Sequence, residues 1–294
     1  MSAVRLSVVI PCYDAEAVIT EQLAALSRQE WDAAWEVVVS ENGSADRSRE
    51  VVEGFRDRLP KLRVVDSSHA RGAARARNVG IQHARGDLIL TCDADDVVAD
   101  DYVPVMAAAL EAHDFVSARL ETDRLNETWQ TESWKNGQAT GLLQSYPPFL
   151  PFAAGASLGF KRYVFDLVGG FDPRFQKRED QDFCWRVQLA GVPLHFVSET
   201  AIHYRYPTEP REMYRQSRAL AEDGVNIYKH YGCRGMPRLT WRQALGGEPG
   251  WMRLLRQLWH FRHYDRTRRA KFVRDLGRQV GRLRGSLRYR TLAP

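Results

Sequence analysis

The strongest constraint on the fold is an alternation of short apolar runs with helical stretches near the start of the chain. Four runs are rich in branched side chains, as buried strands are: RLSVVIP at 5–11, WEVVVS at 35–40, KLRVVD at 61–66 and DLILTC at 87–92. Helices are predicted between them, over 16–26, after Asp46, and over about 72–84. This order predicts an α/β domain whose mostly parallel, Rossmann-like sheet is flanked by helices.

Polar residues follow every predicted strand. They are Tyr13-Asp14, Glu41-Asn42, Asp66-Ser67 and the stretch from Asp93 to Asp96. Ligands of parallel α/β sheets bind beyond the carboxyl ends of the strands. We therefore expect these residues to lie at a common ligand-binding edge.

The fourth strand ends in an acidic cluster, Asp93, Asp95 and Asp96. Ionised carboxylates this close repel one another, and a divalent cation such as Mg²⁺ or Mn²⁺ would remove the repulsion. The alternative is an acidic turn in which Asp96 caps a helix that starts near Asp101. The cluster alone leaves both interpretations open.

Composition and charge narrow the function classes. The 294 residues contain no apolar run of about 18, so we expect no membrane-spanning helix. The four cysteines lack metal-ligand spacing and predict reduced thiols in a cytoplasmic protein. From Arg234 onward the sequence contains sixteen Lys and Arg but three Asp and Glu, a net charge of about +13. Since the net charge of the whole chain is +5, the residues before Arg234 carry about −8. A dinucleotide-dependent dehydrogenase is excluded because GxGxxG is absent.

Five motifs occur in a characteristic order: SVVIPCYDAEAVI, VVVSENGSAD, RGAARARNVGIQHARGDLILTCDADD, GGFDPRF and REDQDFCWRVQLAG. Over roughly 5–205 the chain resembles the family 2 glycosyltransferases of the GT-A fold. The resemblance implies metal-dependent, inverting transfer of a sugar from a nucleotide-sugar donor, as in polysaccharide biosynthesis. It also implies a catalytic domain over 1–207, which leaves 208–294 as a basic helical extension.

Matching positions imply roles for single residues. The nucleotide side comprises Pro11, Tyr13, Glu41, Gly72, Arg77, Asp93 and Arg205, and the metal ligands are Asp95 and His203. Glu41 stands where the family usually has an aspartate that binds uracil. The expectation of a UDP-linked donor therefore depends on a side chain that is one methylene longer than aspartate. Arg77 has a second interpretation, as an ion-pair partner of a carboxylate in the metal loop.

The segment KREDQDFCWRVQLAG supplies the candidate general base. Glu179, Asp180 and Asp182 stand at the start of a predicted helix. An acceptor hydroxyl must lose its proton as it attacks, and a carboxylate within hydrogen-bonding reach suits that role. The alternative is stabilisation of the helix dipole. The resemblance implies that Asp180 is the base, that Glu179 supports it, and that Asp182 serves the helix.

Between the motifs, residues 119–152 show no clear periodicity but contain five aromatic residues, namely Trp129, Trp134, Tyr146, Phe149 and Phe152. We interpret most of them as a small core beneath a long loop, and one or two as stacking partners of the acceptor. Gly155, Gly169 and Gly170 are expected to let the backbone approach the donor sugar.

The basic extension admits two interpretations. Its Leu, Trp and Phe residues alternate with Arg at three- and four-residue spacing, which fits a helix on an anionic membrane surface and hence a lipid-linked or other glycan acceptor. It also fits a helix docked on the acidic body or on a second subunit of a homodimer. Nothing else in the chain supports nucleic-acid binding.

Two other classes of protein share part of this pattern. A nucleotidyltransferase that makes sugar nucleotides would carry a glycine-rich cationic loop after the first strand, and PCYDAEAV has neither feature. A non-catalytic protein of the same fold would be expected to have lost Asp95 or Asp180, and both are present.

Overall fold

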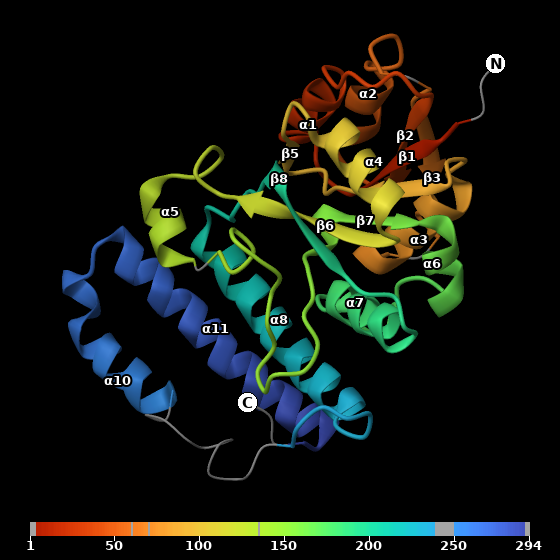
Figure 1. Cartoon of the computed structure of the whole chain (residues 1–294). Helices are drawn as coiled ribbons and strands as arrows, with labels where there is room; N and C mark the ends of the chain where they lie inside the picture. Colours follow the sequence, from red (N-terminus) through yellow and green to blue (C-terminus); the bar gives the residue numbers. More distant parts are fainter. Residues whose placement is uncertain (1–3, 60, 70, 135, 239–249, 292–294) are drawn as a thin grey trace.

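The computed structural model describes residues 4–59, 61–69, 71–134, 136–238 and 250–291, and a single sheet runs through it (Figure 1). The sheet has eight strands in the order β3-β2-β1-β4-β7-β6-β8-β5. Their bounds are β1 Leu6–Cys12, β2 Trp35–Glu41, β3 Arg63–Asp66, β4 Leu88–Thr91, β5 Val97–Val98, β6 Phe115–Glu121, β7 Leu158–Lys161 and β8 His195–His203.

The four strands predicted from the apolar runs are present and pair in parallel, in the order β3-β2-β1-β4. The strands β5, β6 and β7 were not predicted. β7 runs antiparallel between β4 and β6, while β8 runs parallel to β6. The sheet is thus parallel in its first half and mixed in its second, and the α/β prediction holds.

Helices cover both faces of the sheet. On one face lie α1 Ile19–Leu26, α2 Ser48–Glu53 and α4 Tyr102–Ala112, and on the other lie α3 Ala73–His83, α6 Arg162–Val168 and α7 Glu179–Leu189. Alternating strand residues divide between the two cores: Val8 and Val37 face the first, Val9 and Val38 the second. The strands β1 and β2 are therefore buried on both sides, which explains their continuous apolar sequences.

The C-terminal segment is helical, as predicted. It comprises α8 Pro210–Tyr231, α10 Gly250–His260, the short 3₁₀ helix η2 Phe261–His263, and α11 Arg266–Tyr289. Figure 1 shows α11 lying along α8, with α10 on its outer side. No helix in the described part of the chain combines the length and the apolar character needed to cross a membrane.

Glycines bring α11 into direct contact with α8. A Cβ on Gly281 would lie 2.2 Å from the carbonyl oxygen of Arg218, and a Cβ on Gly277 or Gly285 would lie 2.6 or 2.8 Å from atoms of α8. The contacts advance along both helices in the same direction, so α8 and α11 run parallel. Together with the ion pair from Arg266 to Glu127, these contacts show that α11 is docked on the body, one of the two alternatives for the basic extension.

The aromatic residues of 119–152 mostly form a satellite core. Phe149 and Phe152 pack against Trp185 of α7. The ring of Trp134, next to α5 Thr128–Ser133, stacks on Tyr206 at 5.0 Å and carries Arg274 of α11 at 3.8 Å on its ring. This packing ties the C-terminal helix to the segment that follows β8.

Candidate active site

A cavity of about 990 Å³ opens at the carboxyl ends of β1 and β4. Its wall on the sheet side includes seven of the predicted site residues, namely Pro11, Tyr13, Gly72, Arg77, Asp93, Asp95 and Arg205. The opposite wall belongs to α8 and the segment that precedes it. The cavity therefore crosses the predicted boundary at residue 207, and the site is built from both sides of it.

The acidic cluster lies at the end of β4. The carboxylates of Asp93, Asp95 and Asp96 have ligand oxygens within 4.8 Å of one another. Oδ1 of Asp96 accepts the backbone N–H of Arg205 at 2.9 Å, so this side chain does not cap the next helix, whose N-cap is Asp101. Oδ2 of Asp96 is buried without a hydrogen-bond partner in the described residues.

These carboxylates fit a divalent cation. Burial and the negative neighbours raise the pKa of Asp96, and desolvation together with the Asp93 charge raises that of Asp95 to about 6. Three carboxylates thus lie together although the charge of each disfavours the ionised form of the others. One of them, Asp96, has an oxygen without a hydrogen-bond partner in the described residues. Hard cations such as Mn²⁺ and Mg²⁺ take oxygen donors of this kind.

The predicted residues after β8 lie beside this cluster but have other partners. His203 pairs with Val97 across the β5–β8 ladder, and its Nδ1 contacts Glu121. It is not one of the three residues whose ligand atoms gather in the cluster. The Arg205 guanidinium donates to the carbonyl of Asp95 and pairs with Glu21, both at 2.9 Å.

The loops after β1 and β2 carry residues predicted to bind the nucleotide. Tyr13 is 46% exposed, and the guanidinium of Arg71 lies 5.3 Å from its ring centre. The Glu41 carboxylate is buried and accepts the backbone N–H groups of Gly43 and Ser44, and it does not line the cavity. In this structure Glu41 shapes the turn, whereas the neighbouring Asn42 reaches the cavity wall.

A hydrogen bond from Gly72 N–H to Oδ1 of Asn42 fixes the entry to α3 at 2.9 Å. Gly72 has φ +127°, a conformation that side chains rarely adopt. Gly72, the glycine of the segment RGAARARN, is thus required by the backbone.

Arg77 connects the acidic cluster to α7. Its side chain is 4% exposed, and it donates to Asp93 at 2.6 Å and to Glu179 at 2.7 Å. The two carboxylates hold the pKa of the guanidinium above its ordinary value despite burial. The ion pair considered as an alternative role is therefore present, on a residue that also lines the cavity.

Asp180, the candidate general base, and its neighbour Glu179 lie behind Arg77. Burial and the Asp180 charge, opposed by Arg77, raise the pKa of Glu179 to about 7. Burial also raises the pKa of Asp180, whose Oδ2 accepts the N–H of Gly155 at 3.0 Å and whose Oδ1 accepts that of Gln181 at 2.7 Å. Neither carboxylate belongs to the cavity lining.

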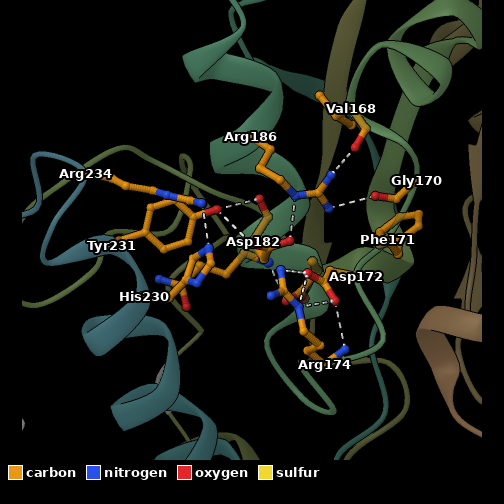
Figure 2. Close-up of polar contacts among 12 residues, drawn as sticks. Val168, Gly170, Phe171, Asp172, Arg174, Asp182, Arg186, His230, Tyr231 and Arg234 are labelled. Atoms are coloured by element: carbon orange, nitrogen blue, oxygen red, sulfur yellow. Dashed lines mark hydrogen bonds and ion pairs between the residues drawn. The ribbon is translucent and has the colours of Figure 1, made fainter. Parts of the chain in front are cut away.

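Asp182 has a structural role. Figure 2 shows its carboxylate between Arg186 of α7 and the hydroxyl of Tyr231 at the end of α8, each at 2.7 Å. Arg186 also donates to the carbonyls of Val168 and Gly170. These bonds fasten α8 to α7 and to the loop after α6, and so hold the cavity walls together.

The sequence did not indicate that α8 contributes to the site. Arg215 and Arg218 of α8, with Lys177 opposite, line the cavity and pair with no carboxylate in the described residues. Glu212 is the acidic residue of this wall. Asp223 of the same helix accepts the backbone N–H groups of Gln176 and Lys177 at 2.6 and 2.7 Å, which fixes the loop before α7. In sequence, the two arginines look like the solvated face of an amphipathic helix.

Comparisons with curated proteins place the chain among glycosyltransferases. Poly(ribitol-phosphate) beta-N-acetylglucosaminyltransferase TarS of Staphylococcus aureus is 32% identical over 234 residues, 76% of this chain and 41% of TarS. The uncharacterized glycosyltransferase YibD of Escherichia coli is 34% identical over 144 residues, 47% of this chain and 41% of YibD. The chain thus spans less than half the length of these two relatives.

Two solved structures share the fold. TarS residues 1–349 in complex with UDP align over 98% of this chain and 92% of that one, with a TM-score of 0.54 and 20% identity. Mannosyltransferase PcManGT of Pyrobaculum calidifontis, in complex with GDP-Man and Mn²⁺, aligns over 96% and 88%, with a TM-score of 0.64 and 19% identity. The GT-A fold expected from the motifs is thereby confirmed. The family model for glycosyl transferase family 2 matches residues 7–169, more than half of the chain, and this protein belongs to that family.

Proposed function

We propose that this protein transfers a glycosyl group from a nucleoside-diphosphate sugar to an acceptor hydroxyl, with inversion at the anomeric carbon. The observation that carries the proposal is the cavity itself. It joins the loops after β1 and β2, the carboxylates Asp93 and Asp95, and the cationic wall of α8 in one space of about 990 Å³. That volume is at the upper end of the range for small-ligand pockets, which is roughly 300–1,000 Å³.

The donor nucleotide is assigned to the sheet side. The exposed ring of Tyr13 offers a stacking surface for a base, and Asp93 offers a carboxylate for the ribose hydroxyls. A uridine nucleotide is the proposed donor base, supported by the relative TarS, whose structure holds UDP. PcManGT holds GDP-Man, so guanosine is the first competitor to test.

The acidic cluster is the proposed metal site. Asp95, with the unpaired oxygen of Asp96 and with His203 as a further candidate, would hold Mn²⁺ or Mg²⁺. When bound, the ion supplies positive charge that stabilises the diphosphate as it leaves. The Mn²⁺ bound to PcManGT supports the choice of metal.

Asp180 is the proposed general base. As the acceptor oxygen attacks from the face opposite the diphosphate, its proton passes to a carboxylate, and attack from that face inverts the configuration. A carboxylate with a raised pKa accepts a proton more readily than an ordinary one at neutral pH. Glu179, held by Arg77, supports Asp180 by keeping a second titratable carboxyl beside it.

The acceptor is assigned to the α8 side. Lys177, Arg215 and Arg218 present positive charge without an ion-pair partner in the described structure, and Nε of Arg218 is buried without a hydrogen bond. This wall supports a glycan acceptor that carries phosphate, either lipid-linked or part of a cell-surface polymer. The name of TarS describes a phosphate-containing acceptor for that enzyme. The four free cysteines fit a cytoplasmic site of synthesis.

Two steps test the function. Thermal-shift measurements with UDP, GDP, dTDP and CDP, with and without Mn²⁺, identify the base through the rise in melting temperature that a ligand of the native state produces. The sugar nucleotides of that base are then supplied with glycerol phosphate or a neutral sugar, and release of nucleoside diphosphate is measured. Release that requires an acceptor and Asp180 supports the proposal. If none of the four nucleotides raises the melting temperature of the protein, the proposal is contradicted.

A further inference from the structure

The helix α10 carries an apolar stripe that stays exposed among the residues that the structure describes. Its members are Trp251, Met252, Leu255, Leu258 and Trp259, with exposed fractions of 42%, 48%, 67%, 57% and 86%. At 100° per residue they fall within one face roughly 120° wide. Large apolar side chains gathered on a free surface mark an interaction site.

The opposite side of the same helix explains how α10 is held. Leu254 is buried, Arg253 forms an ion pair with Asp275 of α11, and the ring of Phe261 in η2 packs at a tilt against Phe272 of α11. The contacts to α11 thus use the inner side and leave the stripe facing outward. Figure 1 shows α11 between α10 and α8, which places α10 on the outside of the molecule.

Positive charge lies along one side of the stripe. Arg256 and then His260 follow it on one flank of α10, and Arg262 follows in η2. The segment from Arg234 to the end carries about +13. An apolar stripe that contains tryptophan and has arginines beside it matches the chemistry of an anionic lipid surface, where aromatic rings enter the interface and guanidinium groups meet the headgroups.

A second copy of the chain fits the stripe less well. A symmetric dimer through α10 would bring the same arginines of two subunits together. Like charges across such a contact repel, whereas an anionic bilayer attracts them.

We infer that α10 is an interfacial membrane anchor, which inserts its stripe into an anionic bilayer while α11 holds it on the catalytic domain. Of the two interpretations of the basic extension, docking thus applies to α11 and membrane contact to α10. The inference rests on the exposure and charge of α10 and stands independently of the sugar-transfer proposal.

Vesicle sedimentation of the full chain tests the inference. We expect binding to phosphatidylglycerol vesicles at least about tenfold stronger than to phosphatidylcholine vesicles, with release as salt rises from about 0.1 M to about 1 M. The double variant Leu255→Glu/Trp259→Glu changes two exposed side chains and should lose at least about tenfold in binding. The matched control, Leu167→Glu/Leu189→Glu, changes two leucines that are each 52% exposed on α6 and α7, and should bind as the natural protein does.

Three results would overturn the inference. The first is no binding of the natural protein to anionic vesicles. The second is equal binding by the stripe variant, which would place the lipid contact elsewhere. The third is a protein that does not bind vesicles but forms a dimer, which analytical ultracentrifugation detects without lipid and which the stripe variant abolishes. Circular dichroism of both variants confirms that each remains folded.

Discussion

The sharpest prediction from the structure concerns the loss of stability when the charge of Arg77 is removed. The variant Arg77→Met keeps a side chain of similar length but removes the cation between Asp93 and Glu179. Both bonds are short, and Arg77 and Glu179 are almost fully buried, so solvent cannot replace the lost charge. Removing one partner of a buried ion pair typically costs about 3–5 kcal/mol, and we expect a loss of stability in that range.

The loss should depend on pH. Arg77 lowers the pKa of Glu179, so without it that pKa rises above its present value of about 7. A carboxyl whose pKa is higher in the folded than in the unfolded state stabilises the folded protein while it is protonated. This contribution to stability is lost as pH rises through the folded-state pKa. The destabilisation by Arg77→Met should therefore be smaller at about pH 5.5 than at about pH 8.

Urea denaturation at these two pH values measures the effect. Arg75→Met is the matched control, because Arg75 is exposed on the same helix and should change stability by less than about 0.5 kcal/mol. Combining Arg77→Met with Glu179→Gln should recover part of the loss, since Asp93 is then the one carboxylate of the two left without its cation. A loss below about 1 kcal/mol, or one independent of pH, would refute the role assigned to the ion pair.

Three further predictions concern the base and the helix contact. Asp180→Asn should leave nucleotide binding intact and lower turnover by at least about a hundredfold; full turnover would move the role to Glu179. Because burial raises the pKa of Asp180, and Glu179 titrates near 7, kcat should increase as pH rises through neutrality; a rate already constant from about pH 5 upward would contradict a base of raised pKa here. Gly281→Ala should destabilise the protein by about 1–3 kcal/mol in thermal unfolding, because its Cβ meets the α8 backbone, whereas Gly224→Ala on α8, with no contact closer than 3.6 Å, should be neutral or stabilising.

The parallel half of the sheet was predictable because its signals are local. The runs around Val8, Val37 and Leu90 are buried on both faces, so each is continuously apolar and ends at polar residues. The strand β7 contains only LGFK and gives no such signal. It is a strand because it fills the space between β4 and β6, which is a property of the assembled sheet.

The site divides in the same way. Residues at strand ends, such as Asp93 and Tyr13, could be placed at one edge because parallel strands end together. The contribution of α8 could not be predicted, because it depends on how Tyr231 and Asp223 fasten a distant helix over the strand ends. For Glu41 and His203, spacing fixed the position in the chain but not the partners of the side chains, which are backbone N–H groups for the first and Glu121 for the second.

The central claim is that the acidic cluster binds a divalent cation together with a nucleoside diphosphate. Isothermal titration of UDP, with and without Mn²⁺, into the natural protein and Asp95→Ala tests it most directly. We predict that Mn²⁺ strengthens UDP binding to the natural protein by at least about tenfold and leaves binding to the variant unchanged. Mn²⁺ dependence that persists in Asp95→Ala would contradict the assigned ligand, and UDP binding that is indifferent to Mn²⁺ in both proteins would contradict the metal site.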